Sequence, residues 1–132
     1  MKVESVLFAN QAATEGPLLN VQGGGWEHYE VPSFPAQVRG FLCGVLVVDE
    51  NEVGALTAVS LSVEDEQGEE QTLAAMVMKD RRQRTHPQIP IRQVFAIPFS
   101  LLVKMPHLVT MHLRYGDDSL ATLAFEVRLM PS

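Results

Sequence analysis

The chain has one cysteine among its 132 residues, so it cannot form an internal disulfide. It also lacks an uninterrupted apolar run of the roughly 18 residues that a membrane-spanning helix needs. Basic residues are few, 10 against 16 acidic ones, and the net charge of −6 disfavours general attraction to nucleic acid or anionic lipid. These shortages predict a soluble, cytoplasmic protein whose partners include no nucleic acid and no membrane.

Recognisable catalytic and metal-binding patterns are missing as well. No serine stands in a nucleophile-elbow context, and Cys43 lies in the most apolar stretch, where a thiol is normally inert. His107 and His112 are five residues apart, so on one strand they would face opposite sides. His28 and Glu30 share a face, but two ligands do not make a metal site. We therefore predict a protein that is not an enzyme and holds no metal and no cofactor.

What the sequence does contain is typical of one globular β domain. Apolar residues make up 46% and charged residues 20%, and the length of residues 1–132 suits a single core. Short segments with period-2 alternation follow one another, and no segment has a convincing amphipathic helical pattern. The pattern predicts an all-β fold: an antiparallel, immunoglobulin-like β-sandwich of roughly eight or nine strands. A small β-barrel is the alternative.

The clearest strands lie in the second third and at the end of the chain. Gln37–Val48 is the longest apolar stretch, and its β-branched residues favour a central strand. Val109–Tyr115 and Ser119–Leu129 alternate regularly on either side of a Gly-Asp-Asp turn, which predicts a hairpin. Pro98 cannot donate to a β ladder, so its strand should end there or lie at a sheet edge.

Three other segments carry weaker patterns. Lys2–Ala9 reads as a strand, and the polar residues Asn10–Gly16 read as a turn after it. Leu101–Pro106 reads as a short connector, with one helical turn as an option. Alternation in Glu70–Lys79 predicts one face bearing Leu73, Ala75 and Val77 and the other bearing Met76 and Met78.

Three consecutive glycines, Gly23–Gly25, precede Trp26, the only tryptophan. Glycine-rich backbone can cradle a phosphate, but a phosphate loop also needs a following helix and a Lys-Ser/Thr pair, and neither is present. Glycine also permits positive φ and close backbone approach. We therefore interpret this segment as a structural corner and Trp26 as a packing residue.

The early residues also carry a resemblance. Phe8-Ala9 through Gly16, then Leu18-Leu19, Gly23-Gly24-Gly25-Trp26 and Val31-Pro32 resemble an uncharacterised bacterial β-sandwich family with an N-terminal Gly-Gly-Gly-Trp signature. The resemblance implies a β-sandwich. It transfers no catalytic residues, because the function of that family is unknown.

Charge is unevenly ordered along the chain. Eight of the sixteen acids lie between Asp49 and Glu70, and five of the ten bases lie between Lys79 and Arg92. Arginine suits planar contacts with carboxylates, so the basic loop is a hypothetical docking site.

The sequence favours a non-catalytic module that binds another protein or itself. A small-ligand-binding domain using the Gly23–Gly25/Trp26 loop is the alternative. The candidate contact residues are Arg81, Arg82, Arg84, His86, Gly24 and Trp26.

Overall fold

A computed structural model describes residues 1–49, 51, 56–65, 67–79 and 86–131. These residues form nine strands and no helix, which confirms the all-β prediction. The described part of the chain therefore contains no helix of the length and apolarity that crossing a membrane requires. The strands are β1 (Lys2–Glu15), β2 (Leu18–Gly24), β3 (His28–Val31), β4 (Ala36–Val48), β5 (Leu56–Glu64), β6 (Glu70–Lys79), β7 (Ile91–Val103), β8 (His107–Tyr115) and β9 (Asp118–Leu129).

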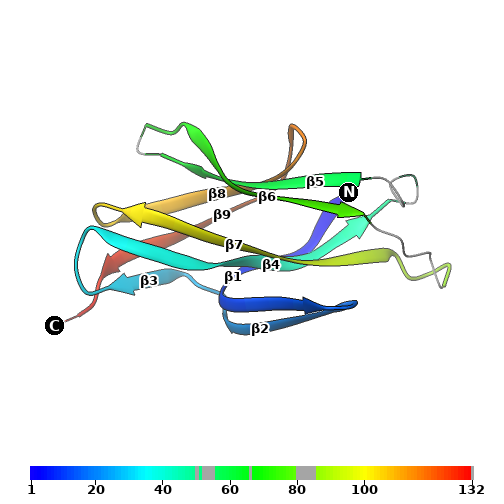
Figure 1. Cartoon of the computed structure of the whole chain (residues 1–132), viewed down its shortest axis with the longest axis horizontal. Coiled ribbons are helices and arrows are strands. Elements are labelled where there is room, and N and C mark those ends of the chain that lie inside the picture. The colour runs from blue at the N-terminus through cyan, green and yellow to red at the C-terminus, as the bar shows by residue number, and fades with distance from the viewer. Residues whose placement is uncertain (50, 52–55, 66, 80–85, 132) are drawn as a thin grey trace.

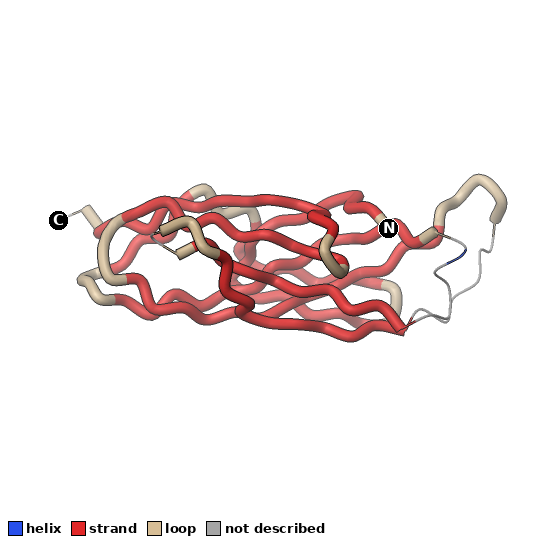
Figure 2. Tube along the Cα trace, turned by 90° about the horizontal axis from the view of Figure 1, so that it is seen from above, coloured by secondary structure: helices blue, strands red, loops and turns tan. Residues whose placement is uncertain are grey.

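The strands form two sheets that pack as a β-sandwich (Figure 1). The first sheet has the order β2-β1-β4-β7 and the second has the order β3-β9-β8-β5-β6. All paired strands are antiparallel except β3 and β9, which are parallel. Strands run along the long axis of the molecule, so its loops gather at the two ends (Figure 2).

The core lies between the sheets and follows from the alternation of each strand. On β4, Leu42 and Leu46 point inward, and the predicted hairpin of β8 and β9 faces them with Met111 and Phe125. Each of these four side chains is fully buried. Pro98 lies in β7, which is an edge strand, as its missing donor predicts.

Two connectors are shorter than predicted, because a partner strand continues the ladder into them. Residues 10–15, predicted as a turn, remain part of β1, because Gln11–Glu15 pair with Leu18–Gln22 of β2. The predicted connector Leu101–Pro106 begins as strand, because β7 pairs with the start of β4 as far as Val103. Backbone hydrogen bonds to a distant segment therefore override weak local patterns.

The predicted faces of β6 hold for Ala75 and Val77 against Met76 but are wrong for Leu73. Leu61 pairs with Ala74, whereas the next residue, Ser62, pairs with Thr72, so Leu73 is an extra residue in β6. Such a bulge interrupts the alternation of side-chain direction. Leu73 consequently packs against the core together with Ala74 and Met76, and Val77 is 67% exposed.

Candidate functional site

The most distinctive feature of the sandwich is a two-stranded arm, defined here as residues Gln11–Gln22. β1 pairs with β4 only as far as Ala9, and the rest of β1 pairs with β2 alone. Figure 1 shows the arm as a separate ribbon below the sandwich. The ladder of β1 and β2 skips the pair between Ala9↔Gly24 and Gln11↔Gln22, and there Gly23 has a φ of +62°. Glycine is needed at this bend because side chains disfavour positive φ.

Trp26 fixes the root of the arm. Its indole Nε1–H donates to Asn10 Oδ1 at 2.9 Å and to the Gly23 carbonyl at 3.1 Å, so it binds both strands where they bend. The ring lies 6.0 Å from the Phe8 ring and 5.5 Å from the Phe125 ring, measured between centroids. Trp26 is thus a half-buried packing residue, in agreement with its interpretation from the sequence.

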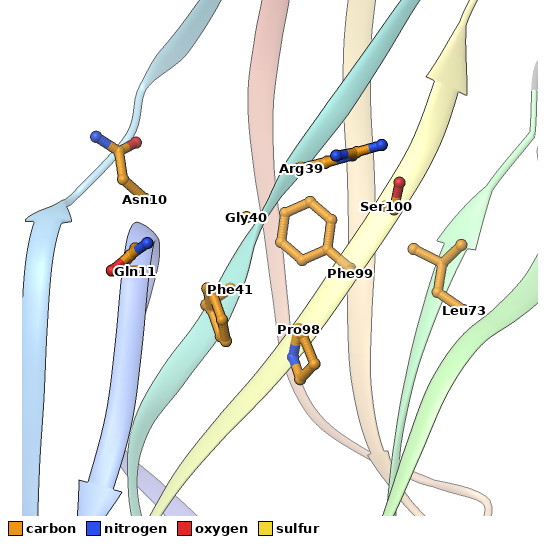
Figure 3. A pocket seen from close by; sticks show the side chains of 9 residues that line it. All are labelled: Asn10, Gln11, Arg39, Gly40, Phe41, Leu73, Pro98, Phe99 and Ser100. Atoms are coloured by element: carbon orange, nitrogen blue, oxygen red, sulfur yellow. The ribbon is translucent and has the colours of Figure 1, made fainter.

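A groove of about 550 Å³ opens between the arm and the outer face of β4 and β7. The register places Arg39 opposite Ser100 and Phe41 opposite Pro98 on that face. Figure 3 shows the Arg39 and Ser100 side chains close together beside the Phe99 ring. The groove is lined by Asn10, Gln11, Arg39, Gly40, Phe41, Leu73, Pro98, Phe99 and Ser100.

The electrostatic character of the groove comes from Arg39. Among the described residues, the other three arginines each pair with a glutamate: Arg92 with Glu4, Arg114 with Glu70, and Arg128 with Glu30. Arg39 is exposed and forms no hydrogen bond or ion pair within that part of the chain. Among the described residues that line the groove there is no carboxylate, and the guanidinium is the one charged group.

Comparison with known proteins places this architecture in a family. A family model described as "Family of unknown function (DUF6941)" matches residues 4–128. The chain belongs to the DUF6941 family. Its matched range includes the arm, Trp26 and both sheets. No curated protein and no solved structure matches the chain.

A second polar cluster of this DUF6941 domain lies on the other sheet, where β5, β6 and β8 meet. Arg114 Nε donates to Glu70 Oε2 at 2.8 Å, and Ser62 Oγ donates to the same oxygen at 2.8 Å. Chiefly through the Arg114 bond, then through Ser62, the pKa of Glu70 falls to about 2. His112 Nε2 lies 2.8 Å from Glu64 Oε1. Because these side chains bind one another, the cluster is a structural network joining three strands.

This cluster does not have the arrangement of a catalytic or metal centre. Ser62 is buried, and its hydroxyl donates to Glu70 and not to the ring of His112; with a pKa of about 2, the Glu70 carboxylate is a weak base for activating it. Within the described ranges there is no group of three or more His, Cys, Asp or Glu that can hold a metal ion. Cys43 is fully buried, and burial raises the pKa of its thiol.

The predicted contact residues of the DUF6941 chain fall in separate places. Arg81, Arg82 and Arg84 lie outside the described residues. His86 is exposed between β6 and β7, and its Nδ1 accepts from the Gln88 amide at 3.1 Å. Gly24 pairs with Ala9 and, with Trp26, belongs to the root of the arm.

Sequence reasoning missed Arg39, Phe41 and Ser100, which the fold brings to one groove. One signal for Arg39 was available. It interrupts the apolar stretch of β4, and alternation places it on the same face as Phe41. Its nearness to Ser100 depends on the pairing of β4 with β7, more than 60 residues away in the chain.

Proposed function

We propose that this DUF6941 domain is a non-catalytic interaction module that binds another protein, or a second copy of itself, by adding a strand to the free edge of β2. An edge strand presents unpaired backbone N–H and C=O groups to any extended segment that approaches it. Main-chain hydrogen bonds then supply affinity and the side chains supply specificity. The observation that supports this function is the contrast between β2 and the other sheet edges.

Three of the four edges formed by the described residues carry a protecting feature. β3 has only four residues, with Glu30 held by Arg128 at 3.2 Å. β7 contains Pro98, which removes a donor. β6 carries the bulge at Leu73 and lies beside β7. Short length, proline, bulges and cover are the means by which proteins keep edges from pairing.

β2 is longer than β3 and has neither a proline nor a register shift. Its seven residues, Leu18–Gly24, contain no charge and no proline. From Leu18 to Gln22 they pair with β1 in one constant register. Leu18 is 64% exposed and Val21 is 38% exposed. The edge is therefore regular, uncharged and partly apolar, which suits it to take up another strand.

The glycine and tryptophan segment contributes to this function indirectly. The indole N–H is already bonded to Asn10 and Gly23, and the ring packs on core aromatics. This use of Trp26 disfavours the alternative function, a small-ligand site at Gly23–Gly25. We regard the segment as the support that holds the arm and its edge. The single buried thiol, Cys43, agrees with the cytoplasmic location that forms part of the proposal.

The test places a charge on the edge by Val21→Lys. A lysine on an edge strand opposes strand addition, because its burial against another chain is costly. The matched control is Val77→Lys, which introduces the same charge at an exposed valine on the β6 edge. Circular dichroism first establishes that both variants fold.

Two readouts follow: light scattering after size exclusion over a concentration series, and recovery of bound proteins on the immobilised domain. We expect an oligomer, or a bound partner, that is lost with Val21→Lys and retained with Val77→Lys. A wild type that stays monomeric and recovers the same proteins as Val21→Lys would overturn the proposal.

A further inference from the structure

We infer that the groove beside the arm binds an extended acidic segment of a partner protein, with Arg39 as the anchor for its carboxylate. This inference rests on the proposed interaction function, but it uses a surface separate from the β2 edge. The occupant is specified by an acidic side chain and an apolar side chain at a fixed spacing.

The carboxylate preference follows from Arg39. The chain carries six more acidic than basic side chains, and the other described arginines are each paired with a glutamate. Arg39 has no such partner in the part of the chain that the structure describes, although its guanidinium presents a planar fork of donors that matches a carboxylate. Because none of the described lining residues is acidic, an incoming carboxylate meets no like charge from them.

Ser100 adds a second donor next to Arg39. Gln37 Nε2 donates to Ser100 Oγ, so that oxygen already acts as an acceptor. A serine hydroxyl still has one hydrogen to donate. Because Arg39 and Ser100 are directly opposite in the ladder, both donors can reach one carboxylate. Gln11, on the arm, contributes a further amide to the groove wall.

An apolar contact lies at a defined distance from these donors. Phe41 and Pro98 form the next outward-facing pair, two residues along β4 and β7. Two residues of a strand span roughly 7 Å, which is also the distance between alternate side chains of an extended peptide. A segment lying along β4 therefore places an Asp or Glu at Arg39 and, two positions away, an apolar side chain at Phe41.

The shape of the groove agrees with a peptide occupant. Its volume of about 550 Å³ lies within the range of about 300–1,000 Å³ that ligand sites have. It reaches from Gln11 on the arm across β4 and β7 to Leu73 on β6 (Figure 3). β4 and β7 lie one strand spacing of roughly 4.8 Å apart, with the arm on one side and Leu73 of β6 on the other, so a peptide backbone can lie along β4 between these walls.

The experiment selects displayed random peptides on the wild type, Arg39→Gln and Arg92→Gln. Arg92 is the matched control, because it is an exposed arginine on β7 outside the groove. We expect wild-type selection to enrich an acidic residue two positions from an apolar one. The strongest such peptide should bind Arg39→Gln at least about tenfold more weakly and Arg92→Gln equally well.

Several results would overturn the inference. If the selected peptides are not enriched in acidic residues, Arg39 is not an anchor for a carboxylate. The same holds if an enriched peptide binds Arg39→Gln as well as it binds the wild type. If the peptide loses binding only with Val21→Lys, it is recognised at the β2 edge. The proposed function then stands, and the inference that the groove binds the peptide is wrong. Phenylpropanoate, an aromatic carboxylic acid, serves as a small-molecule probe of the groove. If it binds in a way that depends on Arg39 and no peptide is enriched, the occupant is a small acid. Self-association that requires Arg39 makes it a second copy.

Discussion

The packing of Trp26 on Gly40 makes a sharp prediction about stability. A Cβ built on Gly40 would lie 2.2 Å from Trp26 Cη2 and 2.9 Å from Cζ2. The indole must therefore retreat by roughly 1 Å or more to reach normal contact distance. Its bonds of 2.9 Å to Asn10 and 3.1 Å to Gly23 then lengthen beyond hydrogen-bonding range. Gly40→Ala should thus strain the core and also release the root of the arm.

The cost has two parts. Overpacking a well-filled core costs about 1–3 kcal/mol. Each lost neutral hydrogen bond adds about 1 kcal/mol at most, since the indole N–H can rebind water near the surface. We expect Gly40→Ala to lower the free energy of unfolding by about 2–4 kcal/mol, which corresponds to a drop in Tm on the order of 10 °C.

The assay is urea unfolding followed by far-ultraviolet circular dichroism, which does not depend on the tryptophan. Gly24→Ala is the control, because its Cβ would meet only the side-chain ends of Leu7 and Val21, at 2.9 Å. In a Trp26→Phe background the smaller ring leaves room at Gly40, so the cost of Gly40→Ala should fall by at least about 1 kcal/mol. An equal cost in both backgrounds, or a cost no larger than that of Gly24→Ala, would refute the reasoning.

Two further predictions concern titrating groups. Because Arg114 and Ser62 lower the pKa of Glu70 from 4.5 to about 2, its contribution to stability is complete above pH 4.5 and is lost as the pH falls towards 2. Glu70→Gln should therefore flatten the fall in urea midpoint across that window, whereas an unchanged profile would contradict the role of the ion pair. The Cys43 thiol is fully buried with a raised pKa, so an aromatic disulfide reagent should label it much more slowly in the native protein than in urea. Equal rates would show that the strand around it opens readily.

The strands with strong alternation were predictable because their pattern reports which face is buried. β8 and β9 alternate over many residues, and Val109, Met111, Leu113, Phe125 and Val127 of their apolar faces are buried. The edge position of β7 was predictable from Pro98, since proline lacks a donor. The packing role of Trp26 was likewise inferred, because nothing beside the glycines supported a phosphate or metabolite site.

The continuation of β1 and the facing of Leu73 in β6 were not predictable. Residues 10–15, expected as a turn, are strand because β2 supplies a partner, and the local sequence does not encode that pairing. One extra residue at Leu73 places that side chain against the core with Met76 and not on the face of Ala75 and Val77, because the bulge interrupts the alternation of side-chain direction. A period-2 pattern contains no information on where a register slips.

The candidate groove was likewise predictable only in part. From the sequence alone, Arg39 and Phe41 share one face of an apolar strand. Only the tertiary structure places Ser100 and Pro98 beside them, leaves Arg39 without an acidic partner among the described residues, and positions the arm as a wall. Residue pattern alone was enough to predict an all-β domain with a glycine corner before Trp26, because burial and backbone freedom act locally. The pairing of distant strands decided the arm, the free edge and the groove, because these depend on which segments meet in space.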